Sequence, residues 1–445
     1  MPQPKPPGPP VPPPPTAPHA SRPRVVKVGR VRTALAGTPG KLRVAGAVGV
    51  VSGLVFAFGA FGAVVARSGG INGADNHAAQ LVRLQAIRSN LTRADAAATN
   101  AFLVGGLEPA DTRASYDDGI ARATAAIAAA SSSSKSDAAT LEKINQDVSH
   151  YVGLVESARA NNRQGFPIGA AYLRQAGNSL RAEVLPPLLK LVTSEEKRIS
   201  DDYGTISSAD AALIAVLVLA IVALLAVQVW LSIKTRRTFN TNLALATALV
   251  VVAGLIGATA MAFAQQKASD VRSGSLSETI LLSTARADVF DAKSAESLTL
   301  INRGSGQPFE AQYQSDFGHA SALFGQIDHL GNTDEGRSAS TSGLGQLLDT
   351  YDTAHQAVRK QDDDGDWDAA VRLATSDDAR GTKVAFAQFD ARSNSRLASE
   401  ATHVSDDLHT ARSPLGAIAV LVLLAGFVAA ALAWRGIAAR LREYR

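Results

Sequence analysis

Four long apolar stretches divide the chain. Each lacks a charged side chain over about the length that a helix needs to cross ~30 Å of hydrocarbon, so each predicts a membrane-spanning helix. Gly49 and Gly53 recur at helical spacing in the first stretch, which indicates either a close helix-packing face or only the glycine-rich composition. The predicted spans are 44–66, 211–233, 243–264 and 414–434.

The two long segments between the spans, 67–210 and 265–413, have a helical pattern. Apolar residues recur three and four positions apart, as at Leu81, Leu84 and Ile87. Runs of glycine, serine and proline divide each segment into four pieces. We therefore expect an up-down four-helix bundle in each segment, with its first and last helices continuing into the flanking spans.

The last helix of each bundle contains residues that disfavour a helix. Pro186 and Pro187 each lack a backbone N–H and are predicted to kink or break that helix in the first bundle. The run "SDDARG" at 376–381 occupies the comparable place in the second bundle. Both last helices are therefore expected in two pieces.

A repeat of about 200 residues runs through the chain, and each copy consists of a span, a bundle and a second span. Both copies run in the same direction, so this is a parallel repeat rather than the inverted repeat of many transporters. The matched landmarks are Asp95 with Lys293, Tyr116 with Tyr313, Tyr151 with Tyr351 and Gly165 with Gly365.

Charge differs between the short and the long segments. Segments 1–43, 234–242 and 435–445 together carry 15 Lys or Arg and a single acidic residue, whereas the two long segments carry 29 basic and 39 acidic residues. Short basic segments stay in the cytoplasm, so both termini are predicted to be cytoplasmic. The predicted fold is all-α: a multi-pass plasma-membrane protein with four transmembrane helices and two tandem extracytoplasmic helical-bundle domains.

The overall formal charge of +4 averages the basic short segments and the acidic long segments, so it does not indicate a nucleic-acid partner. Segment 1–43 has 12 prolines among its first 23 residues and is predicted to be an extended, disordered tail. That tail is either a plain spacer or a docking site. The absence of cysteine fits an extracytoplasmic compartment.

Five aspartates surround a glycine in "QDDDGDWDAAVRLA", residues 361–374. Asp362, Asp364, Asp366 and Asp368 alternate as in a calcium loop, but that loop needs glycine at its sixth position, where this chain has Trp367. A turn followed by a helix whose free N–H groups are capped by aspartate explains the run better.

No catalytic, cofactor or metal site is predicted. The chain has no cysteine, no glycine-rich phosphate loop and no serine elbow, and its eight histidines are scattered. A transporter would need polar groups within the spans, which offer little beyond Ser52, Thr247, Thr259 and Gln228. The chain is therefore expected to be a receptor or adaptor rather than an enzyme; the alternative is a structural or assembly protein of the cell envelope without ligand sensing.

The predicted cytoplasmic segments are too short for a signalling domain, so the signal is expected to pass to a separate protein. The partner surface is expected at the turns farthest from the membrane. In an up-down bundle these are the first and third turns, whereas 131–134 and 331–342 face the membrane. The expected contact residues are Gly105, Gly106, Glu108, Gly165, Arg303, Gly304, Gly365 and Trp367.

Three arginines, Arg88, Arg93 and Arg286, have two interpretations. A guanidinium held between helices would bind a ligand carboxylate through paired hydrogen bonds. The plainer interpretation is that they are exposed and pair with acids one helical turn away. The sequence leaves the ligand, the direction of signalling and a homodimer open.

The architecture resembles the four-helix-bundle sensor domains of bacterial chemoreceptors and histidine kinases, with "GDWDAAVRLA" similar to their usual glycine-acid turn. The doubled arrangement, with "ADAAATNAFLVGGLEP", "AKSAESLTLINRGSG" and "VLPPLLKLVTSEEKRI", resembles the actinobacterial GlnX-type membrane proteins. This resemblance implies that the chain relays amino-acid availability, sensed by an extracytoplasmic glutamate/aspartate-binding lipoprotein, to the cytoplasmic Ser/Thr protein kinase G.

Overall fold

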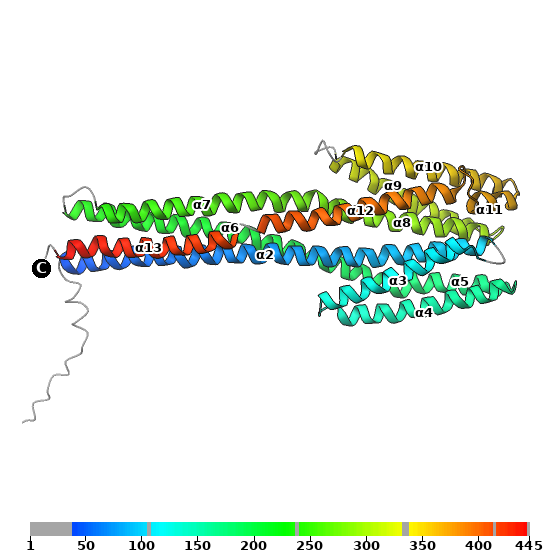
Figure 1. The fold of residues 1–445 in the computed structure, drawn as a ribbon, viewed down its shortest axis with the longest axis horizontal. Helices are drawn as coiled ribbons and strands as arrows, with labels where there is room; N and C mark the ends of the chain where they lie inside the picture. Colours follow the sequence, from blue (N-terminus) through cyan, green and yellow to red (C-terminus); the bar gives the residue numbers. More distant parts are fainter. Residues whose placement is uncertain (1–37, 105–107, 236–239, 332–337, 413–414, 443–445) are drawn as a thin grey trace, which may run out of the picture.

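The fold is wholly helical and strongly elongated. The computed structural model describes residues 38–104, 108–235, 240–331, 338–412 and 415–442, and every regular element in these ranges is a helix, so the all-α prediction is confirmed. Four long helices run side by side at one end of the molecule, and two lobes of shorter helices lie at the other (Figure 1). The four long helices are apolar enough to cross a membrane. The proline-rich tail lies outside the described residues.

The first half of the chain consists of two very long helices joined by an up-down lobe. The helix that opens it is 67 residues long and runs without a break from the first predicted span to the tip of the lobe, ~100 Å at 1.5 Å per residue. We call the helical part between the two spans, residues 67–210, the first lobe. The elements are α2 (Thr38–Val104), α3 (Ala110–Ser133), α4 (Ala138–Arg163), α5 (Ile168–Ser179), the π-helical turn η1 (Leu180–Val184) and α6 (Leu185–Thr235).

The last helix of the first lobe is in two pieces, as predicted, because the π-helical turn η1 separates α5 from α6 directly before the proline pair. Pro186 and Pro187 lie in the first turn of α6, directly after η1. Within η1 the amide of Leu185 donates to the carbonyl of Leu180, five residues back. This wider turn changes the bonding pattern just before the prolines, whose missing N–H groups are tolerated at a helix start.

The second half has the same order of elements but more breaks. Here α7 ends at Ser273, and Gly274, with φ −103° and ψ −102°, separates it from α8. The prediction that the first and last helices continue into the spans is therefore correct for the first lobe and wrong for the first helix of the second; the junction of α12 with α13 lies outside the described residues. The elements are α7 (Thr241–Ser273), α8 (Ser275–Ile301), α9 (Gln307–Gly331), α10 (Ser338–Asp363), α11 (Trp367–Thr375), α12 (Thr382–Arg412) and α13 (Leu415–Arg442).

The break expected at 376–381 is present between α11 and α12. A Cβ at Gly381 would lie 2.3 Å from the carbonyl oxygen of Leu373, so the chain can fold back there only because glycine has no side chain. We call the helices of residues 275–412 the second lobe.

The repeat in the sequence is a repeat in the structure. The matched tyrosines, Tyr116 and Tyr313 on the second helices and Tyr151 and Tyr351 on the third, are all buried. The matched turn glycines also agree, because Gly165 has φ 71° and Gly365 has φ 85°, both in the left-handed region that favours glycine. Each lobe is one copy of the same bundle.

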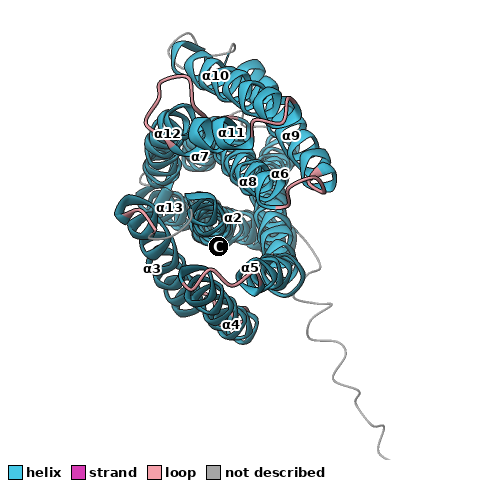
Figure 2. Ribbon diagram, turned by 90° about the vertical axis from the view of Figure 1, so that its right-hand side faces the viewer, coloured by secondary structure: helices cyan, strands magenta, loops and turns pink. Residues whose placement is uncertain are grey.

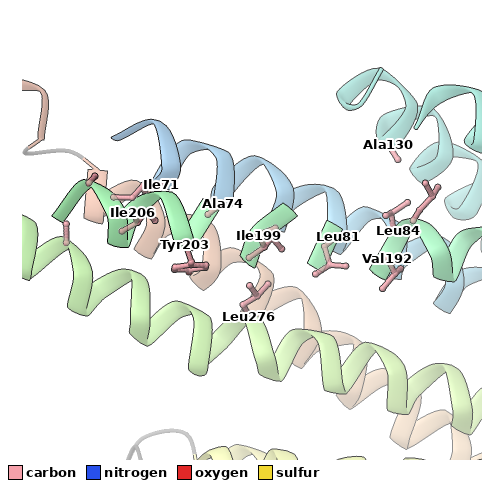
Figure 3. Packing of buried hydrophobic residues seen from close by; sticks show 14 of the residues in the cluster. Ile71, Ala74, Leu81, Leu84, Ala130, Val192, Ile199, Tyr203, Ile206 and Leu276 are labelled. Atoms are coloured by element: carbon pink, nitrogen blue, oxygen red, sulfur yellow. The ribbon is translucent and has the colours of Figure 1, made fainter. Parts of the chain in front are cut away.

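The core of the first lobe continues toward the spans and includes residues of the second half. Figure 3 shows α2 and α6 in contact through apolar side chains, with Leu276 of α8 beside them. Burying one such side chain contributes about 1.5–3 kcal/mol, so this seam is a main source of stability. The labelled residues that meet there include Ile71, Ala74, Leu81, Ile199 and Ile206.

The spans pack closely where glycine meets alanine. A Cβ at Gly53 of α2 would lie 2.7 Å from the backbone nitrogen of Ala430 in α13, and one at Gly426 of α13 would lie 2.6 Å from the Cα of Ala57 in α2. The packing interpretation of the glycine spacing in the first span is thus confirmed. Just beyond this contact, the fully buried Arg67 pairs with Asp210 of α6 and donates to Gln265 of α7 at 3.2 Å.

The two lobes pack against each other through their first helices, α2 and α8. Arg88 Nη2 lies 2.9 Å from Asp288 Oδ1, and Ser294 donates to Asp95 at 3.0 Å. These partners are 199 or 200 positions apart, close to the repeat length, so matched parts of the two copies face each other. In Figure 2, α3 and α12 lie on one side of this central pair, and α5 and α9 lie on the other. The chain thus contains an internal, dimer-like pairing of its own two halves.

Candidate functional site

The predicted partner turns lie at the end of the molecule opposite the four long apolar helices (Figure 1). Gly105 and Gly106 fall outside the described residues. Glu108 accepts a hydrogen bond from Arg159 at 2.9 Å, and this arginine also lies over the ring of Tyr116 at 4.0 Å. Glu108 therefore belongs to the wall of the first lobe as well as to its tip.

The tip of the second lobe brings several of the predicted residues together. The guanidinium of Arg303 lies 3.3 Å from the ring centroid of Trp367, and the indole N–H of Trp367 donates to the carbonyl of Leu300 at 2.8 Å. Gly304, with φ 71°, provides the turn between α8 and α9. Arg303 and Trp367 thus close the tip by a cation–π contact between its two turns.

The aspartate-rich turn is a capped helix start, as predicted. Asp366 accepts a hydrogen bond from the amide of Ala369 at 2.9 Å and caps α11. Asp362 pairs with Arg359 at 2.6 Å, and Asp364 pairs with Lys360 at 2.7 Å. The carboxylates are therefore engaged by the cap and by nearby cations.

A pocket of about 430 Å³ lies between the lobes, which the sequence did not predict. Its walls are α2 and α3 of the first lobe and α8 and α12 of the second, on the side where Figure 2 shows α3 and α12 together. We call it the inter-lobe pocket. Arg93 in its wall is 26 residues beyond Arg67 on the unbroken α2, so the pocket is ~40 Å from the predicted spans. Residues that line it include Arg93, Asn100, Asp118, Lys293, Lys383 and Asp390.

Arg93 joins the two lobes inside this pocket. Its guanidinium lies 3.4 Å from Asp118 of α3 and 3.6 Å from Asp390 of α12. Charge-assisted hydrogen bonds are usually about 2.7–2.9 Å long, so both contacts are loose. Asp390 is held more closely by Arg286 of its own lobe, at 2.6 Å.

A second ion pair crosses the mouth of the pocket. Lys383 of α12 lies 3.0 Å from Asp111 of α3 and 3.0 Å from Asp377. The hydrogen bond from Lys383 lowers the pKa of Asp111, and the hydrogen bond to Asp111 raises the pKa of Lys383. Both groups therefore carry full charge at neutral pH, and the pocket presents both signs.

The three arginines singled out from the sequence all lie between helices. Arg88 pairs across the lobes with Asp288, Arg93 lines the pocket, and Arg286 is buried against Asp390. Burial lowers the pKa of Arg286, although the nearby Asp390 opposes this shift. The interpretation as exposed pairs one turn apart is wrong, because the repeat packs these helix faces against each other.

A buried ionic network supports the pocket from the second lobe. Lys293 pairs with Glu296, which also accepts from Thr382 at 2.8 Å and contacts His355 at 2.8 Å. Burial alone would raise the pKa of Glu296, but Lys293 and His355 lower it to about 2. Burial would lower the pKa of His355, but its contacts with Glu296 and Glu310 raise it. The network fixes the position of Lys293 in the pocket wall.

The sequence carried only a weak signal for the pocket. Lys383 and Asp390 are seven positions apart, so they lie on one face of α12, as any solvated helix face would show. The sequence does not show which helix of the other copy lies opposite α12. The opposite charges at the matched positions Asp95 of α2 and Lys293 of α8 were the one indication that the two copies face each other.

Comparison with known proteins supports a sensing role for the first lobe. Residues 70–204 match a family model described as an actinobacterial sensor domain. This match runs from α2 through α6 and covers the helical lobe rather than the spans. Neither the curated proteins nor the solved structures contain a match to the chain. The chain thus holds a sensor domain beside four helices that could cross a membrane, which implies membrane signal sensing.

Proposed function

We propose that the chain is an integral membrane receptor or adaptor. It relays an extracytoplasmic signal, amino-acid availability presented by a glutamate/aspartate-binding lipoprotein, to a separate cytoplasmic Ser/Thr protein kinase. The sensor-domain match supports sensing, and the excess of basic residues in the short segments supports cytoplasmic termini. The lipoprotein and the kinase rest on the resemblance to GlnX-type proteins.

The observation that carries the relay is the unbroken α2. It touches the second lobe through Arg88 and Asp95, passes the buried Arg67, and packs on α13 at Gly53. A shift of α2 against the second lobe must therefore be transmitted to the contact between the first and fourth spans. Shifts of about 1–2 Å are typical of such helix movements.

The signal requires a partner that binds two arrangements of the lobes differently. The tip at Arg303 and Trp367 is the surface expected to receive the lipoprotein. It includes the first residue of α11, the helix that also packs against α2 and α8. A partner bound at this tip would contact α2 and α8, the first helices of the two lobes, or helices packed on them. Its affinity would therefore depend on how the two lobes are placed relative to each other.

The test uses a photocrosslinking amino acid at Lys234, near the end of α6, in cell membranes. We expect capture of a Ser/Thr kinase there. The matched control places the same crosslinker at the exposed Ser132 of the first lobe, where capture of a cytoplasmic kinase is not expected. Capture of the kinase from Ser132, or from neither site, would overturn the proposed relay and leave an assembly role.

A further inference from the structure

The inter-lobe pocket combines charges of both signs from both copies of the repeat. Its basic side chains are Arg93 and Arg122 from the first lobe and Lys293 and Lys383 from the second. A ligand with only positive charge would be repelled by these four groups, two from each lobe. The pocket is therefore not suited to a simple amine or metal cation.

Acidic side chains line the same pocket. Asp111 and Asp118 come from α3, and Asp390 comes from α12. Phosphate, sulfate or a plain dicarboxylate would have to sit beside these three carboxylates with nothing to offer them. A molecule that carries both a carboxylate and an ammonium group can satisfy both sets.

We propose that the inter-lobe pocket binds a small zwitterion of the α-amino-acid class. This proposal rests on the proposed sensing function and adds a direct ligand site to it. The volume of about 430 Å³ suits one molecule of that size, since small-molecule sites usually begin near ~300 Å³. The walls come from two copies, so the complete site exists only when the lobes are paired.

Arg93 is the group that receives the ligand carboxylate. Its contacts with Asp118 and Asp390, at 3.4 and 3.6 Å, are longer than paired guanidinium–carboxylate hydrogen bonds. A ligand carboxylate facing the planar guanidinium gains two parallel hydrogen bonds that these aspartates do not make. Asp118 keeps its pair with Arg122 at 2.8 Å and Asp390 keeps its pair with Arg286 at 2.6 Å, and both carboxylates can accept from the ammonium group with their remaining lone pairs.

Asn100 supplies a further acceptor. It lines the pocket, and its amide oxygen is buried without a hydrogen-bond partner among the described residues. A buried acceptor without a partner is unfavourable, and a donating ligand removes that cost. Asn100 lies two helical turns beyond Arg93 on α2, so it can receive the other end of a small molecule.

Ligand binding here acts on the relay because α2 and α12 both contribute. The ligand replaces loose contacts between these helices with shorter ones, so it favours the arrangement in which they are closest. The ligand can shift the equilibrium between the two arrangements only by the difference between its binding free energies for them.

The experiment is calorimetry on the full chain in lipid nanodiscs. The probes are L-glutamate and L-glutamine, with succinate, putrescine and inorganic phosphate as comparisons. We expect an amino acid to bind at millimolar concentration or tighter and the other three not to bind. Arg93→Gln should weaken binding about 10-fold or more, because it removes the charged, paired contact. Arg83→Gln, on the same helix and outside the pocket, is the matched control.

A second variant keeps the test independent of the Arg93 ion pairs. Ala387 is an exposed residue of α12 in the pocket wall, so Ala387→Trp fills the pocket without disturbing the core; Ala398→Trp on the same helix is its control. Binding that survives both pocket variants, or equal binding of succinate, would overturn the proposal. If no amino acid binds while the Lys234 crosslink to a kinase is recovered, the pocket assignment fails and the relay stands. Amino-acid binding without kinase capture overturns the relay alone.

Discussion

The cross-lobe pair of Arg88 and Asp288 allows a quantitative test of the internal pairing. The two side chains are only 13% and 10% exposed and lie 2.9 Å apart. At an effective dielectric constant of about 20 their attraction is about 6 kcal/mol before desolvation is subtracted. Burial nevertheless raises the pKa of Asp288, with Arg88 and His319 opposing the shift, so desolvation exceeds the attraction.

Removing the cation alone is therefore the costly change. Arg88→Met leaves the buried carboxylate of Asp288 with His319 as its remaining close partner, 2.7 Å away. We expect a loss of about 2–3 kcal/mol of unfolding free energy at pH 8, slightly below the range for fully buried pairs. The double variant Arg88→Met with Asp288→Asn should recover to within about 1 kcal/mol of the parent, because no unpaired charge remains.

The measurement is urea unfolding of the full chain in mild detergent, followed by far-ultraviolet circular dichroism. Arg113→Met, which breaks exposed pairs with Asp117 and Glu156, is the matched control and should cost less than about 1 kcal/mol. The cost of Arg88→Met should shrink as the pH is lowered from 8 into the acidic range, because the pKa of Asp288 is raised and its protonated form needs no partner. Additive costs in the double variant, or a cost that does not change with pH, would refute the reasoning.

Three further variants test other parts of the structure. Burial raises the pKa of Asp291, in α8, to about 7, so the stability contributed by its protonated form is lost as the pH rises from about 4 through 7. Asp291→Asn should remove that pH dependence and add on the order of 2 kcal/mol to the unfolding free energy at pH 8 in the same urea titration. An unchanged pH profile would contradict this prediction. The hydroxyl oxygens of Thr99 and Ser294 lie 3.3 Å apart across the two lobes. The double variant Thr99→Cys with Ser294→Cys should therefore form a disulfide within one chain, which otherwise has no cysteine. A covalent dimer on non-reducing gels would show instead that the lobes pair between chains. Gly53→Val must push α2 and α13 apart and should lower the unfolding free energy by on the order of 1–3 kcal/mol in a thermal melt. Its control is Gly62→Val, which should cost little because an added Cβ there has no neighbour within 4 Å. Equal effects of the two variants would contradict the close packing of α2 on α13.

Local patterns predicted the parts of the fold that depend on local physics. The four spans and the helical lobes follow from long apolar runs and from apolar spacing of three and four residues. The cap at Asp366 and the left-handed turns at Gly165 and Gly365 follow from residue types with few alternatives. These features need no knowledge of which helices become neighbours.

The remaining features depend on neighbours, and the sequence alone did not predict them. The break at Gly274 is a single glycine within an otherwise helical pattern. The inter-lobe pocket depends on α12 of one copy lying beside α3 of the other. Charged residues such as Lys383 and Asp390 look like a solvated face until that contact is known.

The two copies have diverged in a direction that favours pairing with each other. Arg88 of α2 faces Asp288 of α8, and Asp95 of α2 accepts from Ser294 while also lying 3.4 Å from Arg181. In a symmetric pair of first lobes, Asn90 would take the place of Asp288, because matched positions such as Asp95 and Lys293 are 198 residues apart and an isologous interface brings the same patch of each copy together. Such a pair would leave Arg88 without its acidic partner, and a buried charge without its partner is strongly destabilising. A duplicated bundle whose second copy supplies the acid that Arg88 needs is therefore better suited to fold on itself than to pair with a second chain, and it can form a site whose two sides differ.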